Sequence, residues 1–88
     1  MQATGVTASI RELIVHLSRG NKSQAESLVD DLSVFLNGVL KSKDDPESPG
    51  MRRAQQTFFA IDETRLMLAQ RDFNAALAAA RDAAKEWK

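Results

Sequence analysis

The stretch from Ala54 to Gln70, AQQTFFAIDETRLMLAQ, limits the fold more than any other part of this chain. On a helical wheel at about 100° per residue, one face collects six apolar residues: Met51, Ala54, Phe58, Ile61, Leu68 and Ala69. Phe59 and Leu66 extend that face to one side, while Ala60 and Met67 point nearly opposite. A helix this apolar around its circumference either contacts more than one neighbour or keeps part of its surface for a second chain.

Three other segments also repeat apolar residues at helical spacing, and no segment shows the alternation of a β-strand. The predicted fold is therefore all-α, an antiparallel four-helix bundle made of two helical hairpins. The helices are expected at residues 7–19, 23–41, 49–69 and 73–87. Residues 1–5 have no pattern and are predicted to be disordered. Residues 43–50, KDDPESPG, are predicted to form the loop between the hairpins.

Capping residues set the expected helix boundaries. Two capping boxes are predicted, Ser9 with Glu12 and Ser23 with Glu26, each opening a helix. Ser48 before Pro49 and Asp72 before Phe73 are expected to cap the third and fourth helices. Gly20 can adopt the left-handed conformation that commonly ends a helix, so the chain is expected to turn back there.

Length and charge favour one soluble domain over residues 1–88 and argue against several partners. Twelve basic residues balance twelve acidic ones, and the two halves are balanced as well, so no basic footprint for nucleic acid or a membrane surface appears. The chain has no cysteine, which excludes disulfides and thiolate metal sites. It shows neither a basic, apolar leader nor a membrane-spanning run, and a cytoplasmic location is expected.

The residues that could carry chemistry do not form a recognisable catalytic pattern. His16 is the single histidine, and it falls beside the apolar stripe of its helix without an obvious orienting carboxylate. Asp44, Asp45 and Glu47 lack the alternating ligands and central glycine of a calcium loop. The four glycines are isolated, so no phosphate cradle is present. We expect no enzyme activity and no cofactor.

Asp62 and Arg65 are charged residues that both fall inside the apolar arc of the third helix. Their i, i+3 spacing allows an ion pair, which partial burial would strengthen. One interpretation places both residues at a boundary between helices, with the arginine head in water. The alternative is a polar recognition point within an apolar groove.

The flank of the third helix offers a candidate protein-interaction surface. Phe59 and Leu66 lie one heptad apart there, beside polar and charged neighbours, which is the anatomy of a modest protein contact and also of a flank that meets another helix in the bundle. Trp87 can pack on the bundle or serve as an exposed anchor. The candidate interaction residues are Phe59, Leu66, Met67, Arg52, Glu63 and Trp87.

The hairpins show one similarity within the chain and one to a known family of repeats. At an offset of fifty-one residues, Leu17–Asn21 aligns with Leu68–Asp72 and Ala25 with Ala76, through either duplication or convergence on the same turn. The second hairpin, LMLAQRDFNAALAAARDAA, resembles one tetratricopeptide-type unit, although it covers about a third of the chain and lacks that family's tryptophan, glycine and tyrosine pattern. The resemblance implies protein or peptide binding.

The predicted function is that of a small helical interaction module, such as an adaptor, a chaperone or an immunity or antitoxin protein. It would bind another protein, or itself as a homodimer, through the third and fourth helices. The alternatives are a structural domain and a nucleic-acid-binding module with four phosphate contacts, Arg19, Lys22, Arg52 and Arg53. Neutral net charge makes the nucleic-acid partner the weaker hypothesis.

Overall fold

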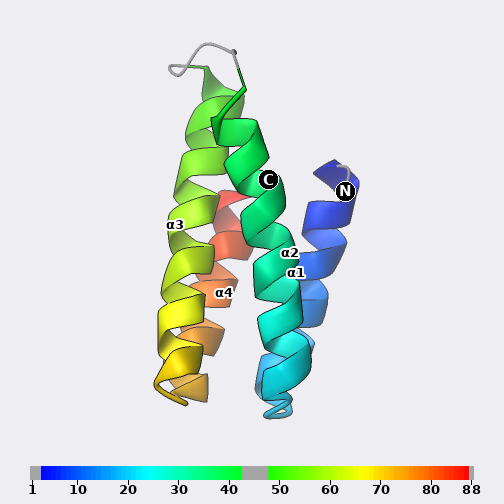
Figure 1. Cartoon of the computed structure of the whole chain (residues 1–88), viewed down its shortest axis with the longest axis vertical. Helices are drawn as coiled ribbons and strands as arrows, with labels where there is room; N and C mark the ends of the chain where they lie inside the picture. The colour runs from blue at the N-terminus through cyan, green and yellow to red at the C-terminus, as the bar shows by residue number, and fades with distance from the viewer. Residues whose placement is uncertain (1–2, 43–47, 88) are drawn as a thin grey trace.

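A computed structural model describes residues 3–42 and 48–87, which form an antiparallel four-helix bundle (Figure 1). The helices are α1 (Ala3–Ser18), α2 (Lys22–Leu40), α3 (Pro49–Ala69) and α4 (Phe73–Glu86). α1 packs against α2 and α4, and α3 packs against the same two helices. The contact between α1 and α4 therefore closes the bundle, and the fold class predicted from the sequence is confirmed.

Each helix contributes one buried row to a single core. α1 and α2 supply most of the large side chains, whereas the buried residues within α4 are all alanines. The row members are Val6, Ile10, Leu13 and Leu17 in α1; Ala25, Val29, Leu32 and Leu36 in α2; Ala54, Ile61 and Leu68 in α3; and Ala76, Ala79, Ala80 and Ala83 in α4. Small residues on α4 allow its neighbours to approach closely.

The buried face of α3 is rotated from the predicted one, because two threonines belong to the core. Thr57 and Thr64 are both fully buried. The Thr57 hydroxyl donates to the carbonyl of Arg53 at 2.7 Å, and that of Thr64 donates to the carbonyl of Ala60 at 2.8 Å. A hydroxyl satisfied within its own helix can occupy a core position without an unpaired polar group.

This rotation corrects three positions on the predicted wheel. Ala69, expected on the buried face, is exposed. Ala60, expected to point away from the core, is buried, and Met67 packs partly buried against the core.

The first helix begins at Ala3, so the prediction of disorder is wrong for residues 3–5 and the predicted start at residue 7 is late. Val6 lies four residues before Ile10 and is fully buried, which extends the apolar stripe of α1 toward the N-terminus. Ser9 lies inside α1 and cannot open it, so the first capping box is wrong. Residues 1 and 2 lie outside the described part of the chain.

Of the caps predicted for the other three helices, that of α2 is wrong and those of α3 and α4 are confirmed. α2 is preceded by Asn21, whose side chain makes no capping bond, and Ser23 is already helical. The Ser48 hydroxyl accepts from the amide of Met51 at 3.2 Å, and the Asp72 carboxylate accepts from the amide of Ala75 at 3.1 Å. Residues 43–47 of the predicted loop lie outside the described part of the chain. The last two residues of that predicted loop, 49 and 50, belong to α3.

The turns after α1 and α3 have the same backbone hydrogen bonds. The amide of Asn21 bonds to the carbonyl of His16 at 2.8 Å, and the amide of Asp72 bonds to that of Met67 at 2.9 Å. Gly20 and Arg71 occupy the left-handed position, with φ of 72° and 59°. Both turns are Schellman motifs. The fifty-one-residue alignment thus coincides with a structural match between the turns.

Candidate interaction surface

The side of α3 that faces away from the core carries two large exposed apolar residues. Phe59 is 65 % exposed and Leu66 is 53 % exposed. They are seven residues apart and so lie on the same line along the helix. Asp62 and Glu63 lie between them and are also exposed. We call these four residues, Phe59, Asp62, Glu63 and Leu66, the α3 ridge.

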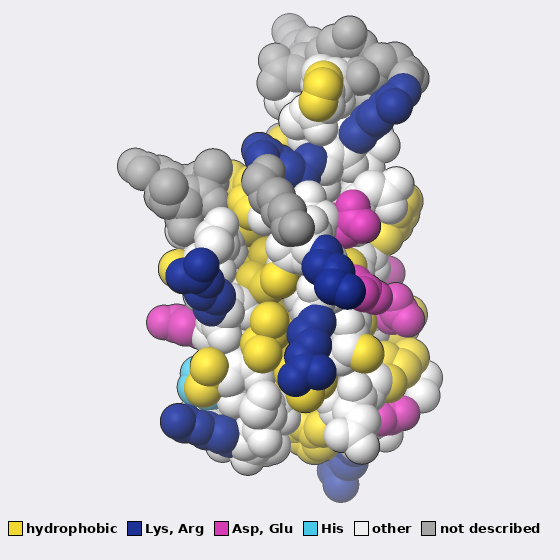
Figure 2. Space-filling view, turned by 180° about the vertical axis from the view of Figure 1, so that it is seen from behind, with side chains coloured by type: hydrophobic (Ala, Val, Ile, Leu, Met, Phe, Trp, Pro, Cys, Tyr) yellow, Lys and Arg dark blue, Asp and Glu magenta, His cyan; other side chains and the backbone are white. Residues whose placement is uncertain are grey.

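An open groove of about 370 Å³ runs beside the α3 ridge, between α3 and α4. Three acidic residues line it, Glu63 from α3 and Asp82 and Glu86 from α4, together with Gln56, Phe59 and Ala60. Figure 2 shows the molecule from behind, with basic side chains along the middle, over α4, and acidic ones toward the side where α3 lies. The α3/α4 groove therefore combines an exposed aromatic ring with negative charge.

The ion pairs found among the described residues lie outside this groove. Lys22 pairs with Glu26 at 3.5 Å and Arg65 pairs with Asp30 at 3.2 Å, both outside this groove. Within residues 3–42 and 48–87, no cation lies at ion-pair distance from Glu63, Asp82 or Glu86. The groove carboxylates are therefore unpaired among the described residues.

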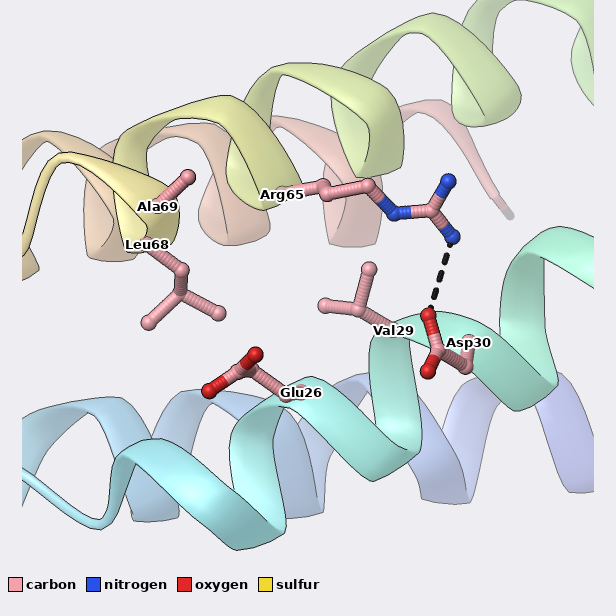
Figure 3. Close-up of a pocket in the computed structure, with 6 residues that line it drawn as sticks. All are labelled: Glu26, Val29, Asp30, Arg65, Leu68 and Ala69. Atoms are coloured by element: carbon pink, nitrogen blue, oxygen red, sulfur yellow. Dashed lines mark hydrogen bonds and ion pairs between the residues drawn. The ribbon is translucent and has the colours of Figure 1, made fainter.

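A second, smaller groove of about 130 Å³ lies on the other flank of α3, against α2. Val29 and Leu68 form its apolar part, and Glu26, Asp30, Arg65 and Ala69 surround them. In Figure 3 the Arg65 side chain reaches from α3 to Asp30 on α2. The same guanidinium donates to the Ser33 hydroxyl at 2.9 Å. Arg65 therefore links α2 to α3 at the rim of this groove.

The predicted pair of Asp62 with Arg65 does not form. Arg65 contacts α2 instead, and both residues are exposed rather than partly buried. The guanidinium is long enough to reach the neighbouring helix, where Asp30 and Ser33 offer two acceptors. The interpretation of a boundary residue with its head in water fits Arg65, whose side chain is 45 % exposed.

The structure brings together only part of the predicted interaction set. Phe59, Leu66 and Glu63 share the α3 ridge, and Arg52 is exposed two helical turns before Phe59. Met67 packs against the core from α3. Trp87 is only 9 % exposed and lies under the Arg53 guanidinium, with 4.5 Å between Cζ and the ring centroid. Trp87 is therefore part of the folded interior, and Met67 is partly buried against the core.

Sequence reasoning named the fourth helix as part of the interaction surface but missed the two acidic residues that it contributes to this groove. Asp82 and Glu86 line the groove from that helix, yet attention to its alanine stripe left both residues out. Their i, i+4 spacing, which places them on one flank of a helix, is the signal that could have found them.

Among the described residues, the remaining candidates for chemistry do not assemble into a site; Asp44, Asp45 and Glu47 lie outside them. The His16 Nδ1 lies 3.3 Å from the Asn21 side-chain amide, a contact within the first turn. Across the described parts of the chain, no three histidine or acidic side chains are placed to hold a metal ion. The basic residues of the nucleic-acid hypothesis separate as well. Arg19 and Lys22 belong to the α1–α2 turn, at the opposite end of the bundle from the start of α3 that carries Arg52 and Arg53 (Figure 1).

The chain matches no protein-family model, no curated protein and no solved structure. Among the helices that the structure describes, none has the length and apolar character required to cross a bilayer. Inference about function therefore starts from the α3 ridge and the groove beside it.

Proposed function

We propose that this protein is a protein-interaction module that binds another protein through the α3 ridge, with α4 forming one wall of the contact. The observation that carries the proposal is the exposure of Phe59 and Leu66 on one line of α3. Covering a side chain of this size is worth about 1.5–3 kcal/mol. Two such side chains two helical turns apart on one line, with a polar rim, have the composition of a small interface core.

The α3 ridge is also well placed to present these side chains without reorganisation. The opposite face of α3 is anchored by Ile61 and Leu68, which are both almost completely buried. Arg65 ties the same stretch to α2 through Asp30 and Ser33. Because the helix is held on its buried face, a partner would order few groups on binding, which lowers the entropic cost of association.

A nucleic-acid partner is less well supported than a protein. The ridge and the α3/α4 groove carry four acidic residues, Asp62, Glu63, Asp82 and Glu86. These carboxylates repel phosphate groups. The basic residues that could contact phosphate are divided between the two ends of the bundle, and Lys22 is already paired with Glu26.

Site-specific photo-crosslinking tests the proposal. A photoreactive amino acid replaces Gln56, which lines the groove beside Phe59, in protein produced in its native cells; the control replaces Asn37, an exposed residue of α2. We expect a discrete crosslinked product at position 56 and none at position 37. The product should disappear when Phe59→Ser is added. Identical products at both positions, or a product insensitive to Phe59→Ser, would contradict the proposal.

Self-association is the second form of the same function, and sedimentation equilibrium separates it from binding to another protein. If the ridge mediates a homodimer, the purified protein should be dimeric and Phe59→Asp should make it monomeric. If the ridge binds a different protein, the wild-type protein and Phe59→Asp should both be monomers with the same helical content. A dimer that survives Phe59→Asp would place the contact elsewhere on the molecule.

A further inference from the structure

The α3/α4 groove has a chemistry that selects among protein partners. We infer that it binds a cationic amphipathic helix, a segment with apolar residues on one face and lysine or arginine on the edges of that face. This inference rests on the proposed function and adds the class of partner. Such helices dock by laying an apolar face into a groove between two helices of the receptor.

The apolar part of the contact comes from Phe59. Its ring is 65 % exposed and lines the groove with Ala60, which is small and leaves room beside the ring. An aliphatic side chain of the partner can therefore pack against the ring over the alanine. Leu66 continues the apolar line by two helical turns, a length that matches the i, i+7 spacing of anchors on a docked helix.

The negative charge of the groove favours a partner that carries lysine or arginine. Glu63 stands on the α3 side of the Phe59 ring, and Asp82 and Glu86 stand on the α4 side. An apolar side chain seated beside the ring is therefore flanked by carboxylates from both helices. No described cation pairs with them, so lysine or arginine of a partner would not have to displace an existing ion pair.

The same charges disfavour a second copy of this chain as the occupant. A two-fold dimer places the same patch on both subunits. Glu63, Asp82 and Glu86 of both protomers would then lie within one contact. Like charges brought together in a contact oppose association. A partner of opposite charge therefore fits the groove better than a copy of the chain.

Fluorescence anisotropy with two synthetic peptides tests the inference. The probe is a helical peptide of about eighteen residues made of leucine and lysine, with leucines along one face; the comparison peptide has glutamate in place of every lysine. We expect the wild-type protein to bind the lysine peptide, more weakly as salt is raised, and not to bind the glutamate peptide. Equal binding of the two peptides, or no binding of the lysine peptide, would overturn the inference.

A matched pair of double variants locates the binding site. Asp82→Asn with Glu86→Gln removes two groove carboxylates, whereas Asp31→Asn with Glu12→Gln removes one aspartate and one glutamate from exposed positions on α2 and α1. The first variant should bind the lysine peptide about fivefold more weakly, because exposed ion pairs contribute modestly. The second should bind like wild type. Equal weakening by both would show attraction by net charge alone.

The two hypotheses fail in different ways. A crosslinked product at position 56 that depends on Phe59, combined with no preference for the lysine peptide, would retain the interaction surface and reject a cationic partner. Binding of the lysine peptide without any such product would reject the proposed cellular role and retain the selectivity of the groove. Loss of peptide binding in Phe59→Ser, with unchanged circular dichroism, is expected if both hold.

Discussion

At the residue scale, identical side chains close together in the sequence have opposite environments. Leu66 is 53 % exposed, whereas Leu68 is 1 % exposed and packs in the core. The helical wheel explains the difference, because residues i and i+2 lie on almost opposite sides of a helix. Surface and core leucines of α3 should therefore respond very differently to truncation.

Leu68→Ala is expected to lower the free energy of unfolding by about 2–5 kcal/mol, through lost burial and a residual cavity. Leu66→Ala is expected to change it by less than about 0.5 kcal/mol, as for other surface substitutions. Urea denaturation followed by circular dichroism measures both. Comparable losses in the two variants would mean that Leu66 is covered in the folded protein.

The buried threonines lead to a second residue-scale prediction. Thr64 donates its hydroxyl to the Ala60 carbonyl of its own helix, so that carbonyl keeps its helical bond if the hydroxyl is removed. Thr64→Val, which keeps the shape, should leave stability within about 1 kcal/mol of wild type or raise it. Thr64→Ala, which removes volume, should destabilise the protein more than Thr64→Val. The reverse order in thermal unfolding would mean that the hydroxyl has a further partner in the core.

At the element scale, the helix ends differ in how they are capped. Asp72 accepts a hydrogen bond from the third residue after it, whereas Asn21, at the matching place before α2, makes no capping bond. Both residues precede a helix of the same bundle and follow a turn with the same backbone hydrogen bonds. The pair therefore isolates the contribution of the cap.

Asp72→Ala is expected to cost about 1 kcal/mol of stability. Asn21→Ala should cost less, since its side chain makes no capping bond and its hydrogen bond to His16 is a long 3.3 Å. Chemical denaturation of the two variants under the same conditions provides the comparison. An equal loss in both would assign the stability to the turn rather than to the cap.

The left-handed positions of the two turns give the other element-scale prediction. Gly20 and Arg71 both have positive φ, and nothing would contact a Cβ added at Gly20. Gly20→Ala should therefore destabilise the protein by about 1–2 kcal/mol through backbone strain alone. Arg71→Gly should have the opposite sign, because it relieves that strain. Thermal unfolding that shows the same sign for both variants would contradict this account.

At the scale of the whole molecule, Trp87 and Arg53 fasten the end of α4 to α3. Trp87 follows the last residue of α4, and its ring lies under the Arg53 guanidinium. α4 otherwise buries alanines, so this ring is the largest buried side chain at its C-terminal end. The contact adds an aromatic ring to a helix whose fully buried residues are otherwise alanines.

Trp87→Ala should lower the free energy of unfolding by about 3 kcal/mol, as expected for removal of a buried aromatic ring. Arg53→Met, which keeps an unbranched side chain but removes the charge, should cost less, about 0.5–2 kcal/mol. Circular dichroism at increasing urea concentration is suitable because it does not depend on the tryptophan. A larger loss in Arg53→Met than in Trp87→Ala would assign the main role to the guanidinium.

The sequence was sufficient for the architecture because it repeats apolar residues at helical spacing and marks the turns clearly. Ser48, Asp72 and Gly20 have the local roles that their residue types indicate. The core face of α3 was less predictable, since Thr57 and Thr64 appear polar until their hydroxyls are paired within the helix. The partner of Arg65 could not be predicted from spacing along α3 either, because Asp30 belongs to α2.

The individual residues of the candidate surface were predictable only on α3, although the fourth helix was expected to take part. Phe59, Leu66 and Glu63 follow from the wheel of a single helix. Asp82 and Glu86 complete the groove only when α4 is placed beside α3, which requires the tertiary structure. Trp87 shows the converse, because composition alone does not tell whether a terminal aromatic residue is covered.

The position of Trp87 also makes the molecule its own optical probe. The chain has one tryptophan and no tyrosine, so near-ultraviolet emission arises from a single indole. That indole is shielded by Arg53 and directly follows Glu86, a residue of the α3/α4 groove. The wavelength and intensity of its fluorescence therefore report, without any label, whether the last turn of α4 is packed against α3 or detached from it.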